Sequence, residues 1–277
     1  AQREVDAIWL TDEIRRRKPT PLEEARSGLV IFEQTLWDAV PTHLRRLDEA
    51  LERHTGRGLP LDARPISFGS WMGGDRDGNP FVTADVTQRA LYLARWMAAG
   101  LYLDEVRALR DELSVVEASD DVKQASGDHP EPYRDVLRRL ERRLEATLLA
   151  AERGSDGEPV DLDDPEPIWR VADLKEPLLA CDASLRAVGA GRVANGRLRD
   201  LLRRVAVFGL TLVRIDIRQD SAEHTATLSS ITRALGVGDY AEWTEDERQS
   251  WLLEELENPR PLVSDALDLS DMAREVL

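Results

Sequence analysis

The sequence predicts a mainly α-helical protein with a few short β-strands. Apolar residues recur at the three- and four-residue spacing of a helix face through most of the 277 residues. Two short segments, 65–71 and 210–218, break this spacing, and both have the pattern of strands. A hydrophobic content of 42% is enough to build a substantial core, so a folded globular protein is expected.

The N-terminal part is predicted to hold three helical runs. Acidic residues at 12 and 13 precede a basic run at 15–18, an order that matches the helix dipole, so a helix is expected to end there. Pro21 suits the first position of the next helix, and Pro41 is expected to end or kink it, with a further helix after Thr42. The apolar face of the helix that begins at Pro21 consists of Leu22, Ala25, Leu29, Phe32, Leu36 and Val40.

The middle and C-terminal parts continue the helical pattern. Thr83 can cap a long helix that runs to about Leu113, and a second long helix is expected over 132–153. Residues 155–167 are acidic and rich in glycine and proline, which favours a mobile surface loop. Further helices are expected at 172–188, 194–207, 221–235 and 244–256.

The segment 210–218 alternates between apolar and charged residues, as a strand with two different faces does. One face carries Val213, Ile215 and Ile217, and the other carries Arg214, Asp216 and Arg218. Such a strand suits the edge of a sheet that faces water. In a chain this helical we instead favour a strand buried in a sheet that segments absent from this chain complete, where the buried charged side chains need partners or a ligand.

The segment Phe68–Pro80, FGSWMGGDRDGNP, is the most informative stretch of the chain. Its glycines allow backbone conformations and close approaches that other residues cannot make. Asp75, Arg76 and Asp77 place charges of both signs side by side, where they either pair with one another or form an anion site. The composition also suits a surface turn, but Trp71 and its neighbouring methionine argue against that. A calcium loop is excluded, because its sixth position is a proline and its twelfth a valine.

Composition and charge narrow the classes of function. A net charge of −16 argues against binding to nucleic acid or to anionic membranes. Without a membrane-length apolar run or a secretion signal, a soluble, cytoplasmic protein is expected. Cys181 is the only cysteine, which excludes an intrachain disulfide and a cysteine-based metal site. The four histidines lack metal-binding spacing, and the usual nucleotide and α/β-hydrolase motifs are absent.

Two segments of the chain resemble the phosphoenolpyruvate carboxylase family. Residues 70–80, SWMGGDRDGNP, and residues 216–219, DIRQ, are similar to motifs of that family. Other similar segments follow one another in order, namely WLTDEIRRRKPTPLEEA at 9–25, SVVEAS, VANGRL and WLLEELENPRPL at 251–262. The resemblance covers the whole chain, and 1–277 is therefore expected to be an internal segment of a single larger domain.

The resemblance implies a largely helical enzyme built around an eight-stranded α/β-barrel, in which 65–71 and 210–218 would be two strands. The implied reaction is carboxylation of phosphoenolpyruvate by bicarbonate to oxaloacetate and phosphate, with Mg²⁺ or Mn²⁺ as cofactor. The family's catalytic residues, metal ligands and mobile glycine-rich loop are expected outside these residues, so the chain alone is expected to be inactive. The family also implies a cytoplasmic, allosteric homotetramer.

The resemblance also implies which residues bind substrate. Arg218 is expected to contact the phosphate of phosphoenolpyruvate, with Arg214 second because it lies on the same strand face. Trp71, Arg76 and Asp77 are expected to line or support the bicarbonate side of the pocket. The alternative interpretation is a helical scaffold or interaction module, derived from the same fold, that has lost the chemistry.

Overall fold

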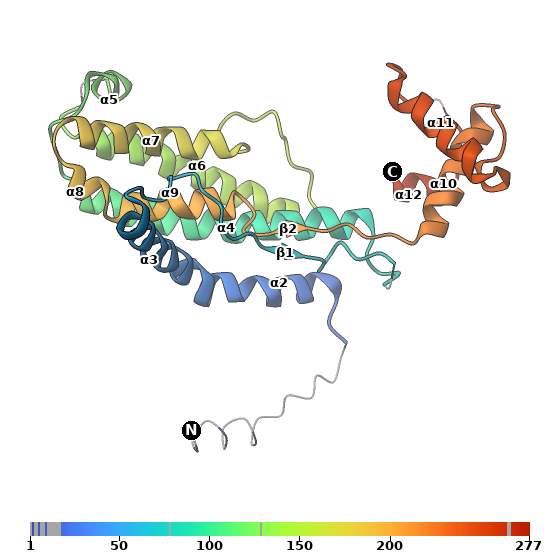
Figure 1. Cartoon of the computed structure of the whole chain (residues 1–277), viewed down its shortest axis with the longest axis horizontal. Helices are drawn as coiled ribbons and strands as arrows, with labels where there is room; N and C mark the ends of the chain where they lie inside the picture. The colour runs from blue at the N-terminus through green and yellow to red at the C-terminus, as the bar shows by residue number, and fades with distance from the viewer. Residues whose placement is uncertain are drawn as a thin grey trace.

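The computed structural model describes residues 2, 5, 9, 18–77, 79–127, 129–264 and 267–277. Within these ranges the chain is mainly helical, with two short strands, which confirms the predicted class of secondary structure (Figure 1). None of the described helices combines the length and the hydropathy that a membrane span requires. Gly78 and the basic residues 15–17, predicted to end a helix, lie outside the described residues.

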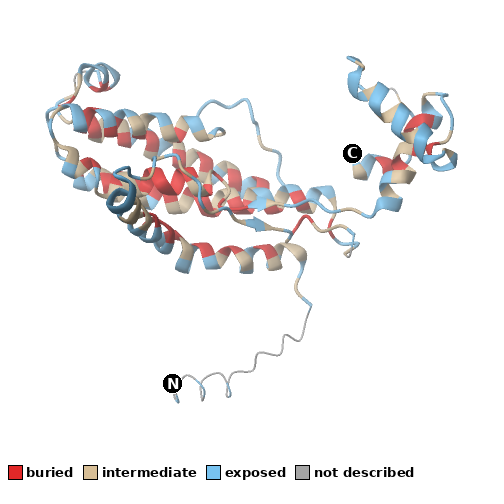
Figure 2. Cartoon of the chain, in the orientation of Figure 1, coloured by how far each residue is buried: buried red, intermediate tan, exposed pale blue. Residues whose placement is uncertain are grey.

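A helical bundle makes up most of the structure. It contains α2 (Pro21–Ile31), the π-helical turn η1 (Phe32–Leu36), α3 (Trp37–Thr55), α4 (Ala84–Glu112), α5 (Asp120–Ala125), α6 (Pro132–Ser155), α7 (Val171–Ala187), α8 (Gly191–Ala194) and α9 (Arg197–Phe208). The two long helices α4 and α6 pack side by side (Figure 1). One apolar cluster runs from Ala25 to Val213, and central side chains such as Leu137 and Leu198 are completely buried (Figure 2).

A smaller helical group follows the bundle. It contains α10 (Ser221–Ala234), the 3-10 turn η2 (Tyr240–Glu242), α11 (Glu245–Glu257) and α12 (Asp271–Val276). Ile231, Leu269 and Ala273 form a separate small core for this group. Figure 1 shows the group beyond one end of the bundle, with an extended segment leading into it. The two strands therefore belong to the bundle rather than to this group.

Most predicted helices agree with the observed ones. α4 ends at Glu112, one residue before the predicted end, and α6, α7, α9, α10 and α11 lie within a few residues of their predicted ranges. The loop predicted at 155–167 connects α6 to α7, and its mobility stays a prediction. Arg143 of α6 donates hydrogen bonds to the carbonyls of Glu166 and Pro167, at 3.1 and 3.3 Å, which ties the end of the loop to the bundle.

Replacing Thr83 with alanine is expected to destabilise the protein by about 1 kcal/mol, the usual cost of losing an N-cap side chain. The Thr83 hydroxyl accepts a hydrogen bond from the Val86 N–H at 3.3 Å, and alanine offers no acceptor. Chemical denaturation of Thr83→Ala measures the loss. Thr83→Ser keeps the acceptor and should retain most of the stability, so equal losses in the two variants would rule out the cap.

Pro41 does not end a helix, and the prediction of a separate helix after Thr42 was wrong. α3 runs without interruption from Trp37 to Thr55 and includes Pro41. In an α-helix the N–H of residue 41 would donate to the Trp37 carbonyl, and proline has no N–H. The Nε of Arg204 on α9 donates to that carbonyl instead, at 2.8 Å. A distant helix thus replaces the missing donor, and the irregularity in this run lies earlier, at η1.

The two strands form a minimal parallel sheet. β1 (Gly69–Ser70) pairs with β2 (Arg214–Ile215), with Gly69 opposite Arg214 and Ser70 opposite Ile215. Both predicted strand segments therefore contain a strand, although only two residues of each are paired in this way. On the apolar face, Val213 is buried, whereas Ile217 is 63% exposed.

Aromatic side chains hold the two strands against the bundle. Phe68 stacks on Phe208, at the end of α9, with ring centroids 5.7 Å apart, and meets Phe32 of η1 edge-on at 5.4 Å. The hydroxyl of Tyr102, on α4, donates a hydrogen bond to the Gly209 carbonyl at 2.8 Å, just before β2. Because such aromatic pairs and buried hydrogen bonds are directional, α4, α9 and η1 together set the position of both strands.

Candidate functional site

The loop after β1 folds back onto the segment after β2. The Trp71 carbonyl accepts the N–H groups of Gly74 and Asp75, at 2.9 and 3.0 Å, which closes a tight turn. Pairing then resumes, since the Arg218 N–H donates to the Gly74 carbonyl and the Arg76 N–H donates to the Arg218 carbonyl, both at 2.9 Å. Asp75 and Arg218 thereby form an isolated parallel bridge beyond the sheet. The backbone alone therefore places Arg218 beside the loop 71–77.

Two glycines are needed for this turn. Gly73 has a φ of +85°, in the left-handed region that favours glycine. A Cβ on Gly74 would lie 2.3 Å from the carbonyl oxygen of Asp216 and 2.7 Å from Cγ2 of Ile215. The loop can approach the strand this closely only because residue 74 has no side chain.

Gly74→Ala is expected to lower the free energy of unfolding by about 1–3 kcal/mol, as overpacking commonly does. The added methyl group meets backbone atoms, which cannot move aside without displacing Asp216 and its neighbours. Gly69→Ala is the matched control, because a Cβ there has no heavy atom within 4 Å. Thermal and chemical unfolding of the two variants test this expectation, and equal stability would contradict the close approach.

Arg218 lies over the ring of Trp71. Its Cζ lies 5.2 Å from the centroid of the Trp71 ring, within the range of a cation–π interaction. The Arg218 side chain is 49% exposed and is 3.7 Å from the carboxylate of Asp216, an ion pair that is long and open to solvent. The guanidinium therefore keeps N–H donors for an anionic ligand.

The other arginine candidate, Arg214, lies further back along the strand. It is exposed in β2, opposite Gly69, and its backbone N–H donates to the Phe68 carbonyl at 3.3 Å. The charged face predicted for this strand, comprising Arg214, Asp216 and Arg218, is exposed in the described chain, so its burial by segments outside the chain stays a prediction. The structure thus brings Arg218 into contact with the loop, whereas Arg214 sits beside β1.

Two carboxyl groups of the loop interact next to Arg218. A hydrogen bond to Asp75 and the negative charge of Asp75 raise the pKa of Asp77 above its ordinary value, and the charge of Arg218 opposes this shift. Two carboxyl groups can hydrogen-bond only through a proton. Oδ1 of Asp75 is buried and receives no hydrogen bond within the described residues. Asp77 therefore takes up a proton more readily than a solvated aspartate does.

Arg76 is tied to the C-terminal helix α12. Its Nη1 donates to the backbone carbonyl of Glu275 at 3.1 Å. The Glu275 carboxylate accepts the N–H of Ala84, the first residue of α4, at 2.6 Å, a favourable place for a negative charge at a helix N-terminus. The sequence did not predict the contact between Glu275 and Arg76, because 199 positions separate the two residues and no local pattern marks Glu275.

The charged loop does not by itself make a metal site. In the described ranges, no three or more histidine, cysteine, aspartate or glutamate side chains come together as possible metal ligands. Asp75 and Asp77 alone offer too few oxygen ligands for Mg²⁺ or Mn²⁺. The residues present therefore do not fit the metal that the family resemblance implies.

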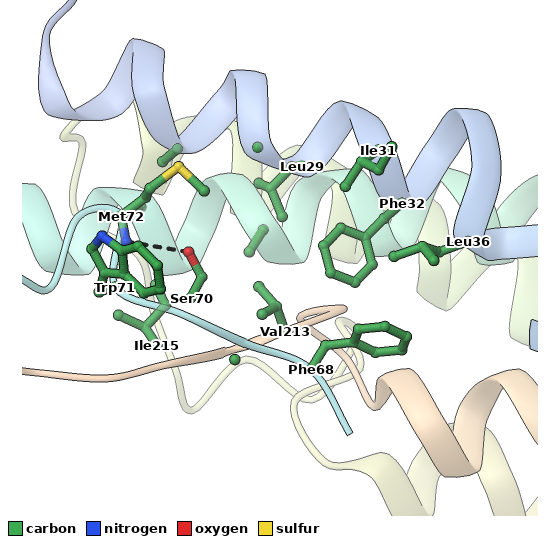
Figure 3. Close-up of a pocket in the computed structure, with 15 residues that line it drawn as sticks. Leu29, Ile31, Phe32, Leu36, Phe68, Ser70, Trp71, Met72, Val213 and Ile215 are labelled. Carbon is green, nitrogen blue, oxygen red and sulfur yellow. Dashed lines mark hydrogen bonds between the residues drawn. The ribbon is translucent and has the colours of Figure 1, made fainter. Parts of the chain in front are cut away.

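An apolar pocket of about 290 Å³ lies next to Trp71 (Figure 3). Its walls come from α2, η1, α4 and both strands, and include Phe32, Phe68, Met72 and Val213. None of its lining residues is charged, so a phosphate or bicarbonate ion would lose its hydration there without compensation. The side of the loop that carries Arg218 is therefore the candidate anion site.

Comparison with known proteins gives the family of the chain. The model of the phosphoenolpyruvate carboxylase family matches residues 1–277. The chain belongs to the phosphoenolpyruvate carboxylase family. The resemblance found in the motifs at 70–80 and 216–219 is thereby confirmed over the whole chain.

Individual phosphoenolpyruvate carboxylases are identical to the chain at about half of the aligned positions. That of Aeromonas hydrophila subsp. hydrophila is 48% identical over 276 residues, which cover 99% of this chain and 31% of that enzyme. The carboxylase of Stutzerimonas stutzeri is 52% identical over 263 residues, or 95% of this chain and 30% of that enzyme. The carboxylase of Hahella chejuensis is 47% identical over 276 residues. The chain therefore spans 31% of the length of the Aeromonas carboxylase.

Proposed function

We propose that the complete protein containing this chain is a phosphoenolpyruvate carboxylase, which joins phosphoenolpyruvate and bicarbonate to give oxaloacetate and phosphate. One observation carries the proposal: in a chain of this family, Arg218 lies just beyond β2 and against the loop that follows β1. Ligands of α/β proteins bind where the carboxyl ends of parallel strands meet. The candidate anion site occupies that position.

The charges at this site suit the proposed reaction. A bicarbonate oxygen attacks the phosphorus, and the bond between phosphorus and the enol oxygen breaks, which gives carboxyphosphate and the enolate of pyruvate. Carboxyphosphate then releases carbon dioxide, and the carbon of carbon dioxide forms the new bond with the enolate carbon. The bicarbonate proton leaves with the phosphate. We assign Arg218 to the phosphate, since a guanidinium matches phosphate oxygens in geometry and stabilises the charge that develops on them.

The other candidates have supporting roles in this proposal. We assign Trp71, Arg76 and Asp77 to the bicarbonate side, because they belong to the loop that faces Arg218. Arg214 is a secondary phosphate contact, since it lies beside β1 rather than against the loop.

The remaining parts of the proposal come from the family. β1 and β2, as parallel neighbours, suit two adjacent strands of the proposed eight-stranded barrel, which two strands cannot close. The catalytic residues and the ligands of Mg²⁺ or Mn²⁺ would come from outside this chain. The complete enzyme is proposed to be a cytoplasmic, allosteric homotetramer.

The test is oxaloacetate formation by the complete protein, followed by its reduction with NADH. We expect formation that requires phosphoenolpyruvate, bicarbonate and Mg²⁺, and none from the 277-residue chain alone. A folded but inactive complete protein would sink the enzyme assignment and favour the scaffold. Activity in the 277 residues alone would contradict the expectation that catalytic parts lie elsewhere.

A further inference from the structure

The contact between Trp71 and Arg218 depends on an unusual backbone arrangement. Trp71 is the first residue of the turn, and its carbonyl accepts the hydrogen bonds that hold the turn together. Gly73, inside the turn, has a left-handed backbone conformation. The ring of Trp71 is 54% exposed, and it meets the guanidinium at 5.2 Å instead of packing wholly into the core. A large aromatic ring is therefore kept at the surface, against one particular arginine.

The same loop also holds the backbone of Arg218. The Arg218 N–H and carbonyl are both engaged, by Gly74 and Arg76 respectively, at 2.9 Å. Trp71, Gly74 and Arg76 belong to one tight loop, so the segment that carries the ring also holds the backbone of the arginine. The freedom that remains to Arg218 lies in its side-chain torsions.

Few other groups can orient that side chain. Among the described residues, its ion pair with Asp216 is 3.7 Å long, and the Asp216 side chain is 60% exposed. A pair of this length and exposure is screened by water and salt and imposes little orientation. Besides the charge of Asp77, the Trp71 ring, 5.2 Å from Cζ, is the contact available in the described chain to orient the guanidinium.

We propose that Trp71 is a positioning residue, whose ring holds the guanidinium of Arg218 with its N–H edges turned toward the anionic substrate. This inference rests on the proposed function and gives Trp71 a role distinct from lining the bicarbonate side. A stacked guanidinium keeps its in-plane N–H groups available, whereas a guanidinium in a bidentate ion pair has them occupied. Stacking therefore orients Arg218 without competing with phosphate.

If Trp71 positions Arg218, its mutation should change KM mainly for one of the two substrates. In the complete protein, Trp71→Leu should raise KM for phosphoenolpyruvate about two- to fivefold, the size of an exposed cation–π contact. KM for bicarbonate should rise less than KM for phosphoenolpyruvate, and Trp71→Phe, which keeps an aromatic face, should give a KM for phosphoenolpyruvate between those of the wild type and Trp71→Leu. A rise confined to KM for bicarbonate would overturn the proposal in favour of a direct bicarbonate contact.

A second readout does not require activity. The rate at which phenylglyoxal modifies Arg218 can be measured by mass spectrometry of the complete protein and its variants. We expect modification of Arg218 to be about two- to fivefold faster in Trp71→Leu and nearly unchanged in Trp71→Phe. Arg214, exposed on the same strand, is the internal control and should react at one rate in all forms.

The KM values and the modification rates together distinguish a failure of the Trp71–Arg218 contact from a failure of the proposed function. Equal modification of Arg218 in the wild type and in Trp71→Leu would overturn the stacking, whether or not the protein is active. A wild type that forms no oxaloacetate, but in which Trp71→Leu speeds modification of Arg218, would sink the proposed function and leave the contact intact. A change in the rate at which Arg214 is modified would identify a folding defect in Trp71→Leu. The KM values and modification rates of Trp71→Phe would then test the proposal in its place.

Discussion

Arg218→Ala in the complete protein is expected to lower kcat/KM for phosphoenolpyruvate by about a hundredfold or more, the usual cost of removing a charge-stabilising donor. The guanidinium is the cation that the loop 71–77 contacts, and its long ion pair with Asp216 leaves N–H groups for the substrate. Arg218→Lys keeps the charge but loses the planar fork of donors, so it should recover only part of the activity. Steady-state kinetics with varied phosphoenolpyruvate measure both effects.

Arg214→Ala provides the matched comparison. It removes the same kind of side chain from β2, four residues before Arg218, where the backbone pairs with Gly69 of β1. We expect a loss of less than about tenfold, since a peripheral contact in high dielectric contributes little. Equal losses in the two variants, with circular dichroism unchanged, would remove the basis for ranking Arg218 first.

Arg204→Met is expected to lower the free energy of unfolding by about 3–5 kcal/mol, the range for breaking a buried charge pair from one side. Arg204 is nearly buried, and besides the Trp37 carbonyl its guanidinium contacts the carboxylates of Glu105 at 3.2 Å and Asp38 at 3.0 Å. It also lies 5.0 Å from the ring of Trp37. Because small domains have only about 5–15 kcal/mol of stability, this loss should be plain in urea denaturation.

Replacing Pro41 should recover part of the stability that Arg204→Met loses. In an Arg204→Met background, Pro41→Ala restores an N–H that can donate to the Trp37 carbonyl, so we expect it to recover about 1 kcal/mol. Arg197→Met is the control, since it removes the other partner of Glu105, at 3.0 Å, from a side chain that is 40% exposed. That variant should cost less than about 1 kcal/mol. Strict additivity of the Arg204 and Pro41 changes would contradict the shared carbonyl.

Local sequence signals were enough to predict most helices. α4 could be bounded at both ends because Thr83 is a strong cap and its apolar residues repeat at helical spacing for seven turns or so. The α6 range follows from its apolar repeat, although no side chain in the described chain caps its first turn, and the α10 range follows from a start near Ser221. The strict alternation in 210–218 also predicted a strand, since a two-residue period has no other simple explanation.

Contacts between distant residues could not be predicted in this way. Pro41 carries a strong local signal for a helix end, and the signal failed because Arg204 donates to a carbonyl 167 positions away in sequence. The pairing of Gly69 with Arg214 depends on the packing of Phe68 and Tyr102 in the bundle, which no local pattern encodes. Local propensity thus gives the elements, and tertiary packing decides how they continue and pair.

The candidate site was predicted in part. The glycines and charges of the loop marked it as unusual, and the alternating strand marked Arg218. Neither signal showed that Trp71 stacks on Arg218 or that Glu275 contacts Arg76, because both contacts join segments far apart in sequence. The residues could be chosen as candidates from the chain alone, but their neighbours required the fold.

The most direct test of the site is a crystal structure of the complete protein with phosphoenolpyruvate bound in the absence of bicarbonate. We predict that nitrogen atoms of the Arg218 guanidinium lie within hydrogen-bond distance of the phosphate oxygens, about 2.7–3.2 Å, with the Trp71 ring against its face. Phosphoenolpyruvate bound elsewhere, with Arg218 turned to solvent, would contradict the proposed role of this site.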